Sequence, residues 1–149
     1  MSDDPTTEGH FAPETVAEAR RAYDSCGPAA KVVVRETARA MGVDRAEYSD
    51  RVTSEVIEAA RDALFASFLR VRLGSREAYD AWRASYDGEV TEHGSPDVDR
   101  VVWHVAPTGA VVMTFHADRE AAVGTLRRQA FGRLYRPAFE PADEDAPDA

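Results

Sequence analysis

Between residues 13 and 86 the chain places apolar side chains at intervals of three and four, the spacing that gathers them on one face of a helix. Pro13 and Pro28 stand where the first turn of a helix tolerates a missing N–H, and Gly42 follows the second apolar stripe. Asp44 and Glu47 have the spacing of a capping box. The pattern predicts helices over about 13–26, 28–41, a short segment after 44, 53–73 and 75–86.

The predicted helix from Thr53 to Leu73 carries two apolar stripes rather than one. Its second stripe, spaced by four residues, consists of Phe65, Leu69 and Leu73. A helix that is apolar on two sides is buried on two sides. Either the rest of the chain or a second chain must therefore cover this stripe. The three residues are candidate interface residues, and the chain is a possible homodimer.

After residue 88 the spacing of apolar residues changes to two, which indicates strands. The segments EVTEH, RVVWHVA and AVVMTFHA predict three strands, the last two joined by the turn PTG. A three-residue loop of this kind places Ala106 opposite Ala110. Asp118 then caps a final helix. In this register one buried face of the hairpin collects six apolar residues: Val101, Trp103, Val105, Val111, Met113 and Phe115.

Together these patterns predict an α+β fold, with an N-terminal helical cluster followed by a three-stranded antiparallel sheet and a C-terminal helix. Residues 13–139 are expected to form a single domain. We expect residues 1–12 to form a flexible segment that leads into the domain, here called the lead. Residues 140–149 are acidic and interrupted by proline, so we expect a disordered acidic tail.

The chain is acidic: 27 Asp and Glu residues oppose 18 basic residues, the net charge is −9, and Lys31 is the single lysine. Such a composition keeps a protein hydrated in concentrated salt, where repulsion between carboxylates is screened. A GC-rich genome would also replace lysine by arginine, so that alternative stays open. The chain has one cysteine, an acidic N-terminus and no apolar run long enough to cross a bilayer. We therefore expect a cytoplasmic protein without membrane contact.

The histidines do not predict a metal site. In the expected hairpin His104 and His116 lie about 13 Å apart along the sheet. Metal ligands sit about 2 Å from the ion, so these two side chains cannot share one. The sequence also lacks phosphate loops, dinucleotide fingerprints and zinc spacings. We predict no metal and no cofactor, and for His104 a hydrogen-bonded structural role rather than a ligand or catalytic role.

The segment GTLRRQAFGRLYR, residues 124–136, contains four arginines and no acid. On a helix these side chains do not form one stripe, and Arg127 falls on the apolar side. From there its guanidinium group either extends past the edge of the sheet to solvent or pairs with a buried carboxylate. Binding of a ligand is the less favoured alternative. One alternative function is a small enzyme with a site near His104 and Arg127. Another is nucleic-acid binding, which high salt disfavours, through Arg119, Arg127, Arg128, Arg133 and Arg136.

Three strings, TEGHFAPETVAEAR, RVTSEVIEAARDALFASFL and AVGTLRRQAFGRLYR, resemble a family of uncharacterised proteins of halophilic archaea, described as a domain of unknown function. They lie near the start, the centre and the end of the predicted domain. The resemblance implies a salt-rich archaeal cytoplasm, and it supplies neither a reaction nor site residues.

These observations favour a non-enzymatic cytosolic interaction or regulatory module adapted to high salt, with an unidentified protein partner. A pocket lined by His104 and Arg127 would favour the enzyme instead. A continuous positive face would favour the nucleic-acid-binding protein.

Overall fold

The fold is seen in a computed structural model, which describes residues 4–140. The helices are α1 (Val16–Ser25), α2 (Gly27–Ala40), α3 (Arg45–Arg51), α4 (Ser54–Ser67), α5 (Arg76–Ser85), α6 (Arg119–Ala130), the π-helical turn η1 (Phe131–Tyr135) and α7 (Arg136–Phe139). The strands are β1 (Thr6–Glu8), β2 (Val71–Ser75), β3 (Val90–His93), β4 (Arg100–Ala106) and β5 (Gly109–Phe115). The α+β class predicted from the sequence is confirmed.

Short polar residues begin most of the helices, as their positions in the sequence predicted. The side chain of Asp44 accepts a hydrogen bond from the Glu47 N–H, and the Glu47 carboxylate accepts one from the Asp44 N–H, so the predicted capping box is present. Ser75 and Asp118 cap α5 and α6 with their side chains alone, which accept hydrogen bonds from the N–H groups of Ala78 and Ala121. These local signals hold because they involve only neighbouring residues.

The sheet differs from the predicted three-stranded antiparallel one. Within residues 4–140 it has five strands in the order β1-β2-β4-β5-β3, and β3 runs parallel to β5 while the other pairs are antiparallel. The extra strand β2 takes the last residues of the predicted helix 53–73, because α4 already ends at Ser67. Leu69, Val71 and Leu73 are buried while Arg70 is exposed, which is the alternation of a strand.

Part of the segment predicted as a flexible lead, residues 1–12, forms regular structure. Residues 6–8 form β1, which pairs with β2, and the N–H groups of His10 and Phe11 donate to the carbonyl of Phe68. The Phe11 ring stacks on Phe65 at 5.4 Å between ring centroids. Residues 4–12 therefore belong to the fold. Residues 1–3, and the predicted acidic tail from residue 141 onward, lie outside the described residues.

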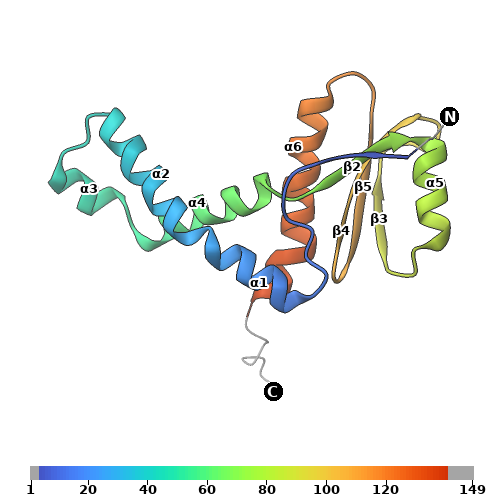
Figure 1. The fold of residues 1–149 in the computed structure, drawn as a ribbon. Helices are drawn as coiled ribbons and strands as arrows, with labels where there is room; N and C mark the ends of the chain where they lie inside the picture. Colours follow the sequence, from blue (N-terminus) through green and yellow to red (C-terminus); the bar gives the residue numbers. More distant parts are fainter. Residues whose placement is uncertain (1–3, 141–149) are drawn as a thin grey trace, which may run out of the picture.

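The β4–β5 hairpin is in the predicted place, but its register is shifted by one residue. Ala106 pairs with Gly109, so the turn has two residues instead of three, and Trp103 faces Val112 rather than Met113. Helix α6 covers one face of the sheet and α5 the other (Figure 1). Because both faces are buried, apolar residues fill both, and the predicted six-residue face divides between them. Val101 and Trp103 face α5, whereas Val111 packs with Leu126 of α6.

Helices α2 and α4 pack side by side, with α3 at their far end, and this hairpin projects away from the sheet (Figure 1). We call the segment 27–67 the arm. At its base Phe65 is fully buried in an aromatic cluster whose other members are Phe11, Tyr23, Phe131, Tyr135 and Phe139. Among residues 4–140, no helix is both long and apolar enough to span a bilayer.

The observed register makes Trp103 and Met113 unequal. Trp103 is fully buried beside Tyr79 and Trp82, whereas Met113 is only half-buried. Replacing Trp103 by Ala should lower the free energy of unfolding by about 3–5 kcal/mol. Met113→Ala should cost about 1–2 kcal/mol, because fewer of its contacts are lost. Urea denaturation at fixed salt measures both, and equal losses would contradict the register.

Candidate functional site

The arm carries an apolar groove of about 270 Å³ between α2, α4 and the loops at either end of α3. Its exposed side chains include Met41 at 69%, Val33 at 46% and Val56 at 40% of their full accessible surface. One charged residue, Arg51, reaches its lining. The remaining lining residues are Val34, Thr37, Ala38, Val43 and Val52. An apolar surface gathered in one place marks an interaction site more often than scattered exposed residues do.

The sequence of α2 explains why this surface stays open. Ala30 and Ala38 are the buried residues of α2, which packs against α4, whereas the run Val32–Val33–Val34 spans more than half of a helical turn. Only part of such a run can face α4. The arm projects away from the sheet (Figure 1), and every residue that lines the groove belongs to the arm itself.

The two long helices of the arm have opposite charge. Helix α2 contains Lys31, Arg35 and Arg39 against one acid, Glu36. Helix α4 contains one base, Arg61, against three acids: Glu55, Glu58 and Asp62. The arm is therefore a dipolar hairpin with a positive and a negative edge.

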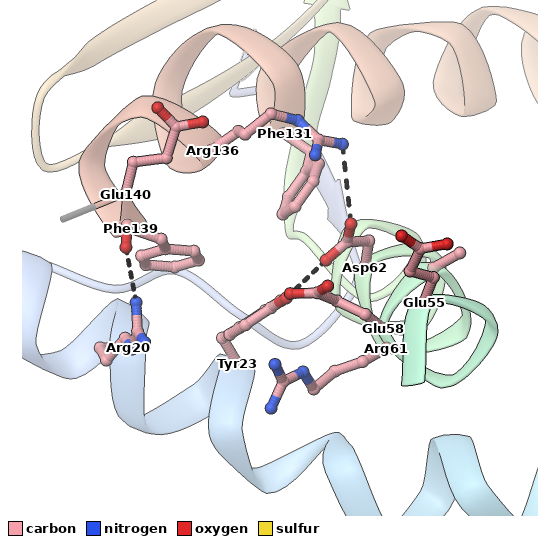
Figure 2. Close-up of a pocket in the computed structure, with 11 residues that line it drawn as sticks. Arg20, Tyr23, Glu55, Glu58, Arg61, Asp62, Phe131, Arg136, Phe139 and Glu140 are labelled. Atoms are coloured by element: carbon pink, nitrogen blue, oxygen red, sulfur yellow. Dashed lines mark hydrogen bonds and ion pairs between the residues drawn. The ribbon is translucent and has the colours of Figure 1, made fainter. Parts of the chain in front are cut away.

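A second hollow, of about 410 Å³, lies at the base of the arm, where α1, α4, η1 and α7 meet (Figure 2). The Tyr23 hydroxyl donates to Asp62 at 2.5 Å, and Arg136 approaches the other carboxylate oxygen of Asp62 at 3.6 Å. Arg20 donates to the Phe139 carbonyl at 2.9 Å. Burial and the bond to Asp62 raise the pKa of Tyr23.

The guanidinium groups of this hollow are also matched to aromatic rings. Arg61 lies over the Tyr23 ring at 4.3 Å from its centroid, and Arg136 lies over Phe131 at 4.9 Å. Figure 2 shows Asp62 between the side chains of Tyr23 and Arg136. Because Asp62 joins Tyr23 of α1 to Arg136 of α7, and Arg20 of α1 bonds the Phe139 carbonyl, the hollow is best explained as the joint that fastens the arm to η1 and α7, although the buried Arg61 Nε has no hydrogen-bond partner among the described residues.

His104 is buried at 1% exposure and has both ring nitrogens bonded. Nδ1 lies 2.6 Å from the Arg70 carbonyl and Nε2 lies 2.7 Å from the Tyr135 hydroxyl. A carbonyl can only accept, so Nδ1 carries the proton and Tyr135 donates to Nε2. Burial lowers the pKa of His104 to about 4 and raises that of Tyr135. The imidazole is neutral, and neither nitrogen is open to a substrate.

Arg127 lies close to His104, and its hydrogen bonds within residues 4–140 go to backbone carbonyls instead of a buried carboxylate. Its Nε donates to the Leu69 carbonyl at 2.9 Å, and its Nη2 donates to the Glu8 carbonyl at 3.4 Å. Burial lowers the pKa of Arg127. The structure thus brings together the two residues of the hypothetical enzyme site, at the turn between α4 and β2. There Arg127 bonds the Leu69 carbonyl and His104 bonds the next one, that of Arg70.

The candidate nucleic-acid contacts are distributed among separate partners. Arg119 forms an ion pair with Glu8, and Arg136 with Asp62. Arg128 donates to Thr125 within α6, and Arg133 of η1 donates to Gln129 of α6. Two of the five candidate guanidinium groups are therefore already next to carboxylates, which reduces the positive charge that phosphates could meet.

The candidate interface residues Phe65, Leu69 and Leu73 are exposed by 0%, 0% and 7%. The chain's own core covers all three, so they offer no surface to a partner. Sequence reasoning missed the groove around Val33 and Met41, although three adjacent valines on one helix were a signal for it. Among residues 4–140 no group of three or more His, Cys, Asp or Glu side chains is placed to hold a metal ion.

Protonation of His104 should make the fold sensitive to acid. Its folded pKa of about 4 lies below the ordinary value of 6.5, so the unfolded chain takes up the proton first. Stability is lost as the pH falls from 6.5 towards 4, by up to about 3 kcal/mol from this group. His104→Gln should lower the unfolding free energy at pH 7 by about 2–4 kcal/mol and flatten this pH dependence. Urea denaturation across pH 4–7 tests it, and an unchanged slope in the variant would count against the assignment.

Comparisons with known proteins bear on the family of the chain. No curated protein matches it, and no solved structure matches it. A family described only as one of unknown function matches residues 10–136, from the segment before α1 to the first residue of α7. The prediction that the chain belongs to an uncharacterised family is therefore confirmed, whereas its origin in halophilic archaea stays a prediction. Because the match covers most of its length, the chain belongs to the family of unknown function DUF5809.

Proposed function

We propose that the chain is a non-enzymatic interaction module, that the groove on the arm is its docking surface, and that its partner is a second copy of the chain. The observation that carries the proposal is the exposure of Val33, Met41 and Val56 around one groove on a projecting helical hairpin. A salt-rich, reducing cytoplasm is the setting we infer from the acidic composition and the single free thiol, Cys26.

The shape of the arm favours a twofold partner. A helical hairpin has one open face, and two such hairpins close into a four-helix bundle in which each covers the other. Helices α2 and α4 are 14 residues each, so each provides nearly four turns to the bundle. In a twofold dimer the groove of each copy contacts the groove of the other. One exposed apolar surface per chain is therefore enough to form both sides of the interface.

Charge complementarity supports a second copy over an unrelated chain. If α2 of one protomer lies beside α4 of its partner, Lys31, Arg35 and Arg39 approach a helix on which Glu55 and Glu58 take no part in the bonds of Asp62 to Tyr23 and Arg136. The twofold axis repeats the arrangement with the helices exchanged. Two chains of net charge −9 repel at long range, and concentrated salt screens that repulsion while leaving the apolar contact intact. The dimer should therefore be stronger in molar KCl than in dilute buffer.

Val33 and Val32 provide a matched pair for testing the interface. Both are valines on α2 with nearly equal exposure, 46% and 45%, but only Val33 lines the groove. Light scattering in molar KCl should give the wild-type chain twice the 16.3 kDa mass of one copy. Val33→Glu should give one copy, because the dimer would bury an unpaired carboxylate. Val32→Glu should remain dimeric.

Circular dichroism establishes that each variant is folded, which an exposed position should permit. A monomeric wild-type chain at submillimolar concentration would contradict the proposal. So would a folded Val33→Glu variant that keeps the dimer mass, since the interface would then lie elsewhere. If Val32→Glu also dissociates the dimer while folded, the groove is not the contact surface.

A further inference from the structure

A third hollow, of about 300 Å³, lies on the sheet next to its edge strand β1. Its lining consists of Pro5, Thr7, Ala12, Arg70, Arg72 and Val105. Thr7 pairs with Arg72 across the β1–β2 ladder, and Arg72 pairs with Trp103 across the β2–β4 ladder. Directly paired residues project from the same face of a sheet. Two arginines and a hydroxyl therefore share one hollow on the α5 side of the sheet.

These two arginines lack the partners that the chain gives to many of its others. Arg72 is half-buried, yet within residues 4–140 its guanidinium forms no hydrogen bond or ion pair. Arg70 has one long hydrogen bond, from Nε to the Gly9 carbonyl at 3.3 Å, and no carboxylate partner within that range. Burial lowers the pKa of Arg72, and no nearby acid offsets the effect.

The contrast with the hollow at the base of the arm is informative. There Arg136 meets Asp62, and Arg20 and Arg61 lie over aromatic rings. In a chain where acids outnumber bases by 27 to 18, two neighbouring arginines without an acid are unexpected. Holding a half-buried charge without a partner costs stability unless something else binds it.

We propose that this hollow binds a small organic anion through its carboxylate or phosphate group. Arg70 and Arg72 would hold the anionic oxygens, which planar guanidinium groups do well, and the Thr7 hydroxyl would donate a third hydrogen bond. Pro5, Ala12 and Val105 form apolar walls for a short carbon skeleton. Because Arg72 is half-buried, salt screens this contact less than it screens a surface pair.

The test is a titration followed by amide chemical shifts of the full chain, with inorganic phosphate in one series and acetate in the other. Added KCl holds the ionic strength constant throughout. At least one probe should shift the amides of Thr7, Arg70, Arg72 and Val105 in a saturable manner. The series that binds more tightly identifies phosphate or carboxylate as the preferred group.

Two variants separate binding from folding. Arg72→Met keeps the length and apolar stem of the side chain, so it should weaken the preferred probe by about tenfold or more. It should also leave the melting temperature unchanged or raise it, because an unpaired half-buried charge is removed. Arg100→Gln, on β4 and bonded to the His116 carbonyl, is the matched control and should bind the probe as the wild type does.

Shifts that never saturate in either series would overturn the proposal, since they indicate screening rather than a site. Equal affinity in wild type and Arg72→Met would overturn it as well. A marked fall in the melting temperature of Arg72→Met with unchanged probe binding would assign Arg72 a structural role instead.

Discussion

The fold depends on how the turn between α4 and β2 satisfies its backbone. Three consecutive carbonyls there accept hydrogen bonds from three distant parts of the chain. Phe68 accepts from the N–H groups of His10 and Phe11, Leu69 accepts from Arg127, and Arg70 accepts from His104. Buried carbonyls without partners are costly, so this turn requires the lead, α6 and β4 to meet at one point. The buried histidine and the arginine on the apolar side of α6 are both consequences of that requirement.

The same turn also sets the direction in which the arm leaves the sheet. It directs β2 into the sheet and leaves α4 to extend away from it with α2 (Figure 1). The aromatic cluster around Phe65 and the Asp62 joint fix the base of the arm, whereas its outer part packs only as a two-helix hairpin. A two-helix hairpin cannot bury both faces of its helices. An open apolar groove is therefore a consequence of the topology, and the interface that we propose rests on it.

Local signals were readable from the sequence, and signals that depend on distant partners were not. The caps at Asp44 and Ser75 and the position of the β4–β5 hairpin follow from neighbouring residues. Residues 69–73, Leu-Arg-Val-Arg-Leu, satisfy a helical stripe and a strand alternation at once, and only the cover supplied by β1 and β4 selects the strand. The register of the hairpin could not be predicted because the prediction assumed that only one face of the sheet is buried. Helix α5 buries the second face, and it lies outside the hairpin sequence. The hollow around Arg72 joins residues of β1, β2 and β4, so no spacing along the chain could indicate it.

The central claim, that the groove of the arm is covered by a second copy, is tested most directly by amide hydrogen exchange at two protein concentrations in molar KCl. If it is correct, amides of α2 and α4 are protected when the protein is concentrated and exchange faster on dilution, because the two-helix hairpin alone is weakly held. Amides of β4 and β5, buried within each copy, keep the same rates at both concentrations. Exchange rates in the arm that do not depend on concentration, whether fast or slow, would contradict the claim.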